Sequence, residues 1–250
     1  VSESMVAESW IRPKDWYYLN SYILPVIYHE ISKFSFIKKF IHFSTPEVYG
    51  ATRENFKETN YFNPSTPYGV SRVTCDQVCN ILFITKKFPI IITRASNVYG
   101  EHQKLYRIIP KTIYSIITKK KLPLHGGGRS LRNFIHIDDV CKALIILLNK
   151  GINGETYHIS SKRIISIKNL VNLISKKLNT NLKSSVKISE DRVGKDQLYF
   201  LNSNKIKKLG WKPNIKLEDG IDKVIKWIKS NKKNLDKEKI SYEHKNQNIK

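Results

Sequence analysis

The stretch Pro67-Tyr68-Gly69-Val70-Ser71-Arg72 lies between two apolar, β-branched runs and sets how the surrounding chain folds. Proline suits the first turn of a helix, and Ser65 or Thr66 can serve as the N-cap, so we predict a helix over 67–85. Residues four apart share one helix face, so the Tyr68 phenol and the Arg72 guanidinium should point the same way. A fixed positive charge favours the phenolate, which can transfer a proton near neutral pH.

The apolar runs on either side of this helix have the composition of buried parallel strands. We predict a strand over 41–44, a short apolar run closed by polar residues, and a second over 89–96, which is continuous and β-branched. Alternating segments continue downstream: helices over 108–119, 138–149, 167–178 and 217–229, strands over 134–137 and 156–160, and a turn at 126–128. Strands that alternate with helices predict an α/β fold with a doubly wound, Rossmann-like parallel sheet.

Composition limits the class of protein. The chain has 250 residues, is 40% hydrophobic and contains no apolar run long enough to cross a membrane, so we expect one large or two small globular domains. No secretory signal pattern is present at the start. We expect Cys75, Cys79 and Cys141 to be buried free thiols in a reducing cytoplasm, and we expect no metal site.

The net charge of +23 raises the question of an anionic partner. The lysines are scattered along the chain and are not interleaved with aromatic residues on one helix, so we do not expect nucleic acid to be the partner. A basic nucleic-acid protein remains an alternative, and it predicts strongly salt-dependent oligonucleotide binding. A positive field would also attract a small anionic substrate such as a nucleotide diphosphate.

Several blocks together resemble the extended short-chain dehydrogenase/reductases, the NAD-dependent epimerase/dehydratase family. The resemblance covers the chain from about Met5 to Lys229, and the motif sequences are most similar to those of the dTDP-glucose 4,6-dehydratases. The blocks are Ala7-Glu8-Ser9, Phe43-Ser44-Thr45-Pro46-Glu47-Val48-Tyr49-Gly50, the Tyr68 to Arg72 helix start, Thr93-Arg94-Ala95-Ser96-Asn97-Val98-Tyr99-Gly100, residues 122–140, and Asp191-Arg192-Val193-Gly194.

The resemblance implies a catalytic set of Thr45, Glu47, Tyr68 and Arg72. Thr45 would hydrogen-bond the reacting sugar hydroxyl, Tyr68 would be the base for hydride transfer, and Glu47 would remove a proton next to the new ketone. Two positions depart from the family pattern. Arg72 replaces the family's Lys, and a guanidinium is not its equivalent. Pro46 replaces the Asp that protonates the leaving hydroxyl in dehydratases.

The same resemblance implies the binding residues. For NAD they are Ala7, Ser44, Tyr68, Arg72 and Ser96. For the nucleotide-diphosphate sugar they are Asn97, Arg107, Pro123, Leu124, His125, Arg132 and Arg192. We expect Asp138 and Asp139 to cap the following helix and Trp211 to lie in the core. For Tyr99, core packing and a ligand contact both stay open.

The pattern Gly-x-x-Gly-x-x-Gly, which cradles a pyrophosphate, does not occur in the sequence. The family's glycine loop precedes its Ala-Glu-Ser block, so we expect an N-terminally truncated fold whose sheet lacks its first strands. We assign residues 1–100, completed by about 134–160, to a partial NAD-binding domain. Residues 101–133 and 161–230 form a smaller nucleotide-sugar-binding region, and 231–250 a polar tail.

The leading hypothesis is therefore NAD-dependent, 4,6-dehydratase-like modification of a nucleotide sugar in carbohydrate biosynthesis. It would proceed through transient oxidation of the sugar 4-hydroxyl. A 4-epimerase or decarboxylase of the same family, or a catalytically impaired nucleotide-sugar-binding fragment, remain alternatives. NADP is not excluded, because the segment that would distinguish the two cofactors is not in the sequence. We expect a cytoplasmic protein, and the resemblance implies a homodimer that pairs through the helix bearing Tyr68. Core burial would explain the apolar residues of that helix equally well.

Overall fold

The computed structural model describes residues 2–52, 55–190 and 198–244. Two compact units are present. The first contains Val1–Ser96, Val140–Ser161 and Val193–Pro213, and the second contains Asn97–Asp139, Lys162–Arg192 and Asn214–Lys250. Residues 198–213, which we had assigned to the nucleotide-sugar region, therefore cluster with the first unit.

The first unit is built on a parallel sheet in the order β1-β2-β6. The strands are β1 (Phe40–Ser44), β2 (Ile90–Ala95) and β6 (Thr156–Ile159), and the register places Ser44 opposite Arg94. Every residue of β2 and β6 is buried, as continuous β-branched runs require. These are the strands predicted from the sequence, and they confirm an α/β fold with a parallel sheet.

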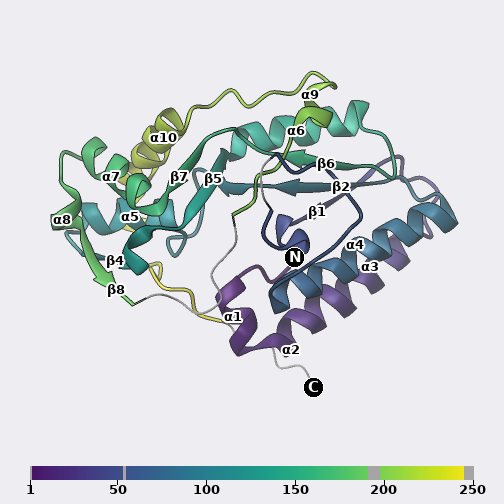
Figure 1. The fold of residues 1–250 in the computed structure, drawn as a ribbon, viewed down its shortest axis with the longest axis horizontal. Helices are drawn as coiled ribbons and strands as arrows, with labels where there is room; N and C mark the ends of the chain where they lie inside the picture. Colours follow the sequence, from purple (N-terminus) through teal and green to yellow (C-terminus); the bar gives the residue numbers. More distant parts are fainter. Residues whose placement is uncertain (1, 53–54, 191–197, 245–250) are drawn as a thin grey trace. The chain divides into compact units, whose positions relative to one another are not determined.

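Helices cover both sides of this sheet. Figure 1 shows α3 (Leu24–Ile31) and α4 (Pro67–Lys86) side by side on one side of the strands, and α6 (Ile137–Lys150) on the other. The Thr66 hydroxyl accepts a hydrogen bond from the Gly69 N–H at 2.9 Å, which confirms the predicted N-cap of α4. The remaining helical segments of this unit are α1 (Val6–Ile11), α2 (Pro13–Trp16), the π-helix η1 (Tyr17–Ile23), the 3-10 turn η2 (Pro46–Tyr49) and α9 (Asn204–Lys207).

The second unit has two small sheets. β3 (Asn97–Tyr99) pairs in parallel with β5 (Leu131–His136), which pairs antiparallel with β7 (Ile164–Ser166). β4 (Leu122–His125) pairs in parallel with β8 (Val186–Ser189). The helical segments are α5 (Ile108–Ile117), η3 (Gly126–Gly128), α7 (Ile167–Lys177), α8 (Leu182–Ser185), α10 (Leu217–Ser230) and α11 (Lys232–Leu235).

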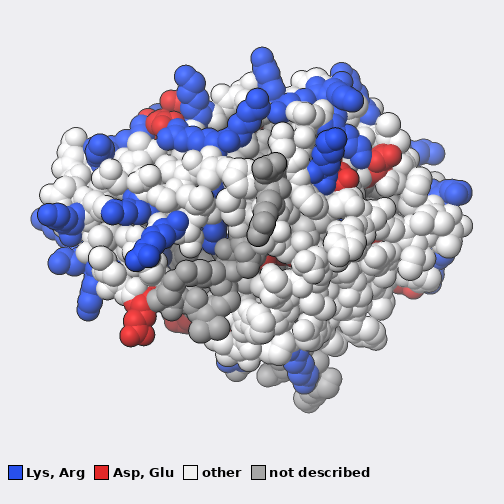
Figure 2. Space-filling model, in the orientation of Figure 1, with Lys and Arg blue, Asp and Glu red and all other residues white. Residues whose placement is uncertain are grey.

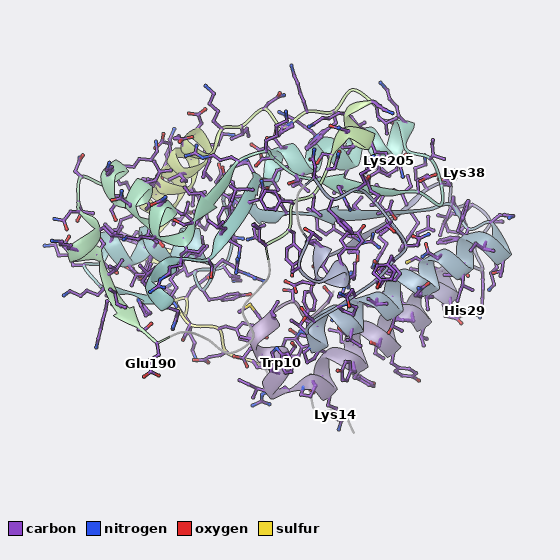
Figure 3. All side chains as sticks on the ribbon, viewed as in Figure 1. Trp10, Lys14, His29, Lys38, Glu190 and Lys205 are labelled. Carbon is purple, nitrogen blue, oxygen red and sulfur yellow. The ribbon has the colours of Figure 1, made fainter. Side chains whose placement is uncertain are left out.

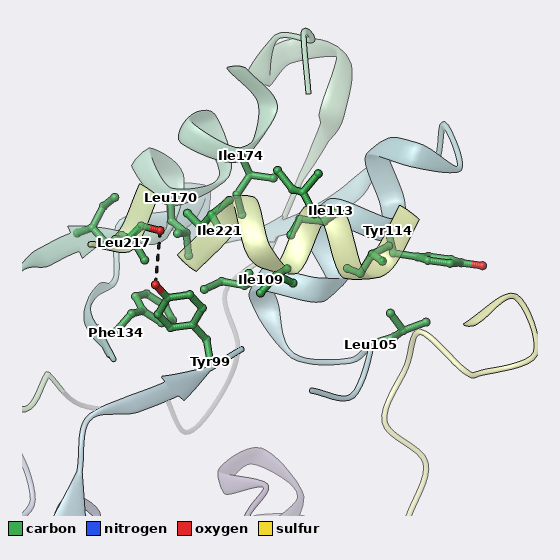
Figure 4. Packing of buried hydrophobic residues seen from close by; sticks show 14 of the residues in the cluster. Tyr99, Leu105, Ile109, Ile113, Tyr114, Phe134, Leu170, Ile174, Leu217 and Ile221 are labelled. Atoms are coloured by element: carbon green, nitrogen blue, oxygen red, sulfur yellow. Dashed lines mark hydrogen bonds between the residues drawn. The ribbon is translucent and has the colours of Figure 1, made fainter. Parts of the chain in front are cut away.

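The core of the second unit forms between α5, α7 and α10 (Figure 4). Tyr99 lies in this core, and its hydroxyl donates to the Leu217 carbonyl at 3.4 Å. Gly220 permits the close approach of α10, since a Cβ there would lie 2.2 Å from the Tyr99 hydroxyl oxygen. Tyr99 is therefore a core residue, which resolves the alternative left open by the sequence.

Two expectations are corrected. Cys141 is exposed, whereas Cys75 and Cys79 are buried as predicted. The Asp139 carboxylate, in the first turn of α6, also accepts from the backbone N–H groups of Asn214 and Ile215 with Oδ2, at 3.0 and 2.9 Å, and so fixes the segment before α10. The chain after Ser230 is not a loose tail throughout, because Leu235 is buried in the core of the second unit.

Candidate active site

Two of the predicted catalytic segments meet where α4 begins. Thr45 follows β1, and its hydroxyl accepts from the Glu47 N–H at 3.3 Å to cap the start of η2. A Cβ on Gly69 would lie 2.9 Å from the Glu47 carbonyl oxygen, so the first turn of α4 packs directly on the backbone of η2. Glu47 itself is only 5% exposed and is not a solvated loop carboxylate. The fold thus brings the Thr45–Glu47 segment against the turn that carries Tyr68.

Tyr68 lies at the buried start of α4. Its side chain packs with Val6 and Trp16 of the N-terminal helices. Its backbone N–H donates to the hydroxyl of Ser9 at 3.2 Å, and Ser9 belongs to the predicted Ala-Glu-Ser block that also contains Ala7. A single hydrogen bond therefore joins two blocks that are 59 residues apart in the sequence.

Arg72 is buried one turn further along α4, with 2% of its surface exposed. Its Nη2 donates to the Phe43 carbonyl at 2.7 Å, at the carboxyl end of β1. Its Nε is buried without a hydrogen-bond partner among the described residues. Burial alone would lower the pKa of Arg72, but the nearby Tyr68, Cys75 and Asp76 raise it above its usual value. The guanidinium is therefore a permanent positive charge inside the first unit.

A buried polar network lies beneath this site, and the sequence analysis did not predict it. Asp76 bridges two partners: Oδ1 lies 2.9 Å from His42 Nε2, and Oδ2 lies 2.6 Å from Arg94 Nη2. Arg94 also donates to the Tyr49 hydroxyl, which lies 2.9 Å from His158 Nε2. The only sequence signals were a histidine within an apolar strand and an acid four residues after Arg72.

The electrostatics of the network follow from its pairing. Burial tends to raise the pKa of Asp76, but the hydrogen bond from His42 and the charge of Arg94 outweigh it and hold this pKa at about 2. Burial lowers the pKa of His42, and burial together with the charge of Arg94 lowers that of His158 to about 3. At neutral pH the network therefore contains a carboxylate, a guanidinium and two neutral imidazoles.

The two serines predicted at the cofactor side are buried at strand ends. Ser44 closes β1 beside Asp76, and its hydroxyl helps to lower the pKa of that carboxyl. Ser96 follows β2 and is 6% exposed, and its hydroxyl has no hydrogen-bond partner among the described residues. Carboxyl ends of parallel strands are where such sheets bind ligands.

The predicted substrate residues on β4 lie on two different faces, because successive side chains of a strand point to opposite sides. Leu124 is 4% exposed and packs with Leu122 and Val171, so its side chain belongs to the core of the second unit. Pro123 points to the opposite face and is exposed. His125 Nδ1 lies 2.9 Å from the Ser189 hydroxyl of β8. Pro123 and His125 can thus face a ligand, whereas Leu124 supports them from below.

The remaining predicted substrate residues are dispersed within the second unit. Asn97 opens β3 and is exposed. Arg107 immediately precedes α5, and its guanidinium lies 5.5 Å from the ring centroid of Tyr106. Arg132 lies on β5, and its Nη1 donates to the Leu131 carbonyl at 2.6 Å. Arg192 lies outside the described residues.

The described residues provide neither a metal site nor a membrane-spanning helix. No group of three or more His, Cys, Asp or Glu side chains is arranged there to hold a metal ion. None of the helices in the described ranges is long and apolar enough to span a bilayer. Figure 2 shows lysines and arginines mainly along the upper and left-hand edges of the view, with few over the lower right. Lys14 lies on α2, Lys38 on the loop before β1 and Lys205 on α9 (Figure 3).

Comparison with known proteins identifies the family. The model of the GDP-mannose 4,6 dehydratase family matches residues 2–224. The dTDP-D-glucose 4,6-dehydratases of Mus musculus and Homo sapiens are each 34% identical to this chain, over 236 and 239 residues. These matches cover 92% of the chain and 66% and 67% of the two relatives. The chain thus spans about two thirds of the length of these relatives.

Solved structures agree with this assignment. The dTDP-glucose 4,6-dehydratase of Streptomyces venezuelae, solved with NAD and TYD bound, superposes with a TM-score of 0.87 at 28% identity, covering 93% of this chain and 72% of that one. The UDP-glucuronic acid 4-epimerase of Bacillus cereus shares the fold at 24% identity and a TM-score of 0.85, with 92% and 73% coverage. The chain belongs to the NAD-dependent epimerase/dehydratase family and resembles its dTDP-glucose 4,6-dehydratases.

Proposed function

We propose that this chain supplies the catalytic and nucleotide-sugar-binding parts of an NAD-dependent 4,6-dehydratase acting on a nucleotide-diphosphate sugar. The observation that supports this most strongly is the packing of the Gly69 turn on the Glu47 carbonyl. It places the Thr45–Glu47 segment against the start of the Tyr68 helix, in a chain 34% identical to dTDP-D-glucose 4,6-dehydratases. Other members of the family act on other nucleotide sugars, so the base and the sugar stay open.

The residues present fit the nicotinamide half of NAD. Arg72 Nε and Ser96 Oγ are buried polar atoms without partners among the described residues, and a ribose or carboxamide could satisfy them. We assign Ala7, Ser44, Ser96, Tyr68 and Arg72 to this contact. No Gly-x-x-Gly-x-x-Gly segment in the sequence supplies a pyrophosphate cradle. NAD, or NADP, would provide the hydride acceptor when bound.

In the proposed reaction each protein group has one task. The Thr45 hydroxyl hydrogen-bonds the sugar 4-hydroxyl, and the Tyr68 phenolate removes its proton. The permanent charge of Arg72 favours that phenolate. Glu47 then removes the proton next to the 4-ketone, which becomes acidic once the carbonyl has formed. We place the sugar nucleotide on Asn97, Arg107, Pro123, His125, Arg132 and Arg192, where guanidinium groups suit a diphosphate.

Pro46 supports a second candidate, a 4-epimerase or decarboxylase. Proline carries no proton, so this position cannot protonate a leaving hydroxyl as a dehydratase needs. Arg72 in place of the family's lysine supports a third, a nucleotide-sugar binder without turnover. A basic nucleic-acid protein is a further alternative, which strongly salt-dependent oligonucleotide binding would support.

The test uses the 250-residue chain and a chimera in which the N-terminal segment of the human dTDP-D-glucose 4,6-dehydratase precedes Met5. Both are supplied with NAD and with dTDP-glucose or UDP-glucose, and the alkaline absorbance of a 4-keto product is followed. A 4-keto-6-deoxy product supports the dehydratase, and an epimerised sugar supports the epimerase. Calorimetric binding of dTDP without product supports the binder, and no binding by either protein would contradict the proposal.

We also propose that the protein acts in the cytoplasm as a homodimer that pairs through α3 and α4. Tyr22, Val26, Ile27, Ile81 and Ile84 are large apolar residues on these helices and η1, and each is more than 40% exposed. Two copies could bury these residues against each other. Ile84→Lys should convert a dimer to a monomer in sedimentation velocity, whereas Ile188→Lys, at a residue on β8 that is also well exposed, should not. A wild-type monomer would contradict the proposal.

A further inference from the structure

The imidazole of His42 lies outside the proposed chemistry yet between two charged groups of α4. Its Nε2 is 2.9 Å from Asp76 Oδ1 and 3.3 Å from Arg72 Nη2, and its Nδ1 is 2.8 Å from the Tyr28 hydroxyl. The side chain is inaccessible to solvent. Every polar contact of this ring is therefore with the protein.

The protonation of His42 follows from its neighbours. The Asp76 carboxylate, with a pKa of about 2, is ionised and can only accept, so Nε2 must carry the hydrogen that joins them. Burial lowers the pKa of His42, so the ring is neutral and Nδ1 is an acceptor. Burial also raises the pKa of Tyr28 far above its usual value, so its hydroxyl keeps a proton to donate to Nδ1.

In this tautomer, the contact between His42 Nε2 and Arg72 Nη2 is not a hydrogen bond. Because Nε2 carries a hydrogen directed at Asp76, it cannot accept from Arg72, and the 3.3 Å contact joins two donors. The hydrogen bond of Nη2 is the one to the Phe43 carbonyl at 2.7 Å. The guanidinium is therefore held on the backbone of β1.

Arg72 and Asp76 would otherwise be natural partners. They lie four residues apart on α4, the spacing at which opposite charges pair along a helix. Within the described chain, Asp76 instead accepts a hydrogen bond from neutral His42 on Oδ1 and forms an ion pair with Arg94 through Oδ2. His42 thus occupies the oxygen that Arg72 could otherwise reach.

We propose that His42 is a positioning residue, which withholds Asp76 Oδ1 from Arg72 and so keeps the guanidinium at the carboxyl end of β1, near Tyr68. The proposal deepens the proposed function and rests on it for its catalytic consequence. The claim about the position of the Arg72 guanidinium does not depend on the proposed function. Arginine replaces the family's lysine at this position, and His42 thus prevents the Arg72 guanidinium from forming an ion pair with Asp76.

The structural test uses the full 250-residue chain without cofactor or substrate. His42→Leu removes the donor to Asp76, and Arg72 is expected to leave the Phe43 carbonyl for the freed carboxylate. A changed Arg72 Nε–H resonance in ¹⁵N-arginine NMR and a moved guanidinium in a crystal structure would report this. His42→Gln, whose amide can still donate to Oδ1, is expected to leave both unchanged. If the leucine variant does not fold, His42→Asn, whose amide is too short to reach Oδ1, should release Arg72 in the same way.

Two histidines provide matched controls. His158→Gln changes an equally buried imidazole that does not contact Arg72, and His29→Gln changes the exposed histidine on α3 that is labelled in Figure 3. Neither should move the Arg72 resonance. An Arg72 that stays on the Phe43 carbonyl in both His42→Leu and His42→Asn would overturn the proposal.

The functional arm uses the chimera described above. His42→Leu is expected to lower kcat about 10²-fold with KM for the nucleotide sugar unchanged, since a misplaced catalytic group affects the chemical step. His42→Gln should retain kcat within a few-fold. A wild-type chimera without activity would count against the proposed function and leave the Arg72 measurement intact. An active chimera whose His42→Leu variant keeps full kcat would overturn the positioning role alone.

Discussion

Asp76 Oδ2 lies 2.6 Å from Arg94 Nη2 and 3.2 Å from Arg94 Nε, and both side chains are inaccessible to solvent. This two-point contact ties α4, which carries Tyr68 and Arg72, to the central strand β2. A buried charge pair is tolerated only where further hydrogen bonds complete it, and here His42 and Tyr49 do so. The position of the candidate site therefore depends on this pair.

The pair makes stability depend on acid pH. The pKa of Asp76 is depressed in the folded protein from 3.8 to about 2, so its contribution is complete above about pH 4 and is lost as the pH falls through 2. The shift corresponds to about 2 kcal/mol of unfolding free energy. Urea unfolding at stepwise lower pH would measure it.

Asp76→Asn should remove that pH dependence and lower the unfolding free energy by about 3–5 kcal/mol, because Arg94 stays buried without a charged partner. Asp222→Asn is the control, since Asp222 forms an exposed ion pair with Lys177. An Asp76→Asn variant as stable as the control would show that the buried pair contributes little.

Tyr68→Phe removes the proposed base and keeps the packing against Val6 and Trp16. We expect kcat in the chimera to fall by about 10²–10⁴-fold, with nucleotide-sugar binding retained. Steady-state kinetics and calorimetry measure the two quantities. Tyr61→Phe, at a tyrosine that is 73% exposed, should leave kcat unchanged. Full activity in Tyr68→Phe would exclude Tyr68 as the base.

Pro46→Asp restores the acid that dehydratases carry at this position. The backbone tolerates the change, since Pro46 is the first residue of η2 and the capping bond there is donated by Glu47. We expect more 4-keto-6-deoxy product relative to simple oxidation, because a carboxylic acid can protonate the leaving hydroxyl. Product ratios by mass spectrometry, with Pro46→Asn as the isosteric control, give the answer. Equal ratios in the two variants would argue against a dehydratase.

Gly69→Ala tests the packing that assembles the site. Alanine in place of glycine would favour a helix by about 1 kcal/mol, but its Cβ would lie 2.9 Å from the Glu47 carbonyl oxygen and 3.0 Å from Pro64 Cβ. We expect a net loss of about 1–3 kcal/mol in unfolding free energy, as for other overpacked sites, together with reduced kcat. Val70→Ala, at the exposed neighbouring position, is the control for helix propensity. A stabilised and fully active Gly69→Ala variant would mean that α4 does not need this close approach.

Much of the fold could be predicted because its signals are local. Short apolar runs predicted β1 and β2, and Thr66 was one of the two residues predicted to cap α4. The helices over residues 6–31 were not predicted, since Pro13 and Pro25 interrupt an aromatic stretch without clear periodicity. The short strands β4 and β8 were also missed, because pairing between segments far apart in the sequence defines them.

The sequence by itself determined the alternation of strand and helix from β1 to β2, the family motifs and the identity of the candidate catalytic residues, because each is carried by spacing within a few residues. Only the tertiary structure decided that Glu47 is buried, that Leu124 belongs to the core, and that the Arg72 guanidinium rests on a strand carbonyl beside His42. These contacts join residues 29 and 30 positions apart, and no local pattern encodes them. They form because burying a charged or polar group is costly unless the fold brings a partner to it.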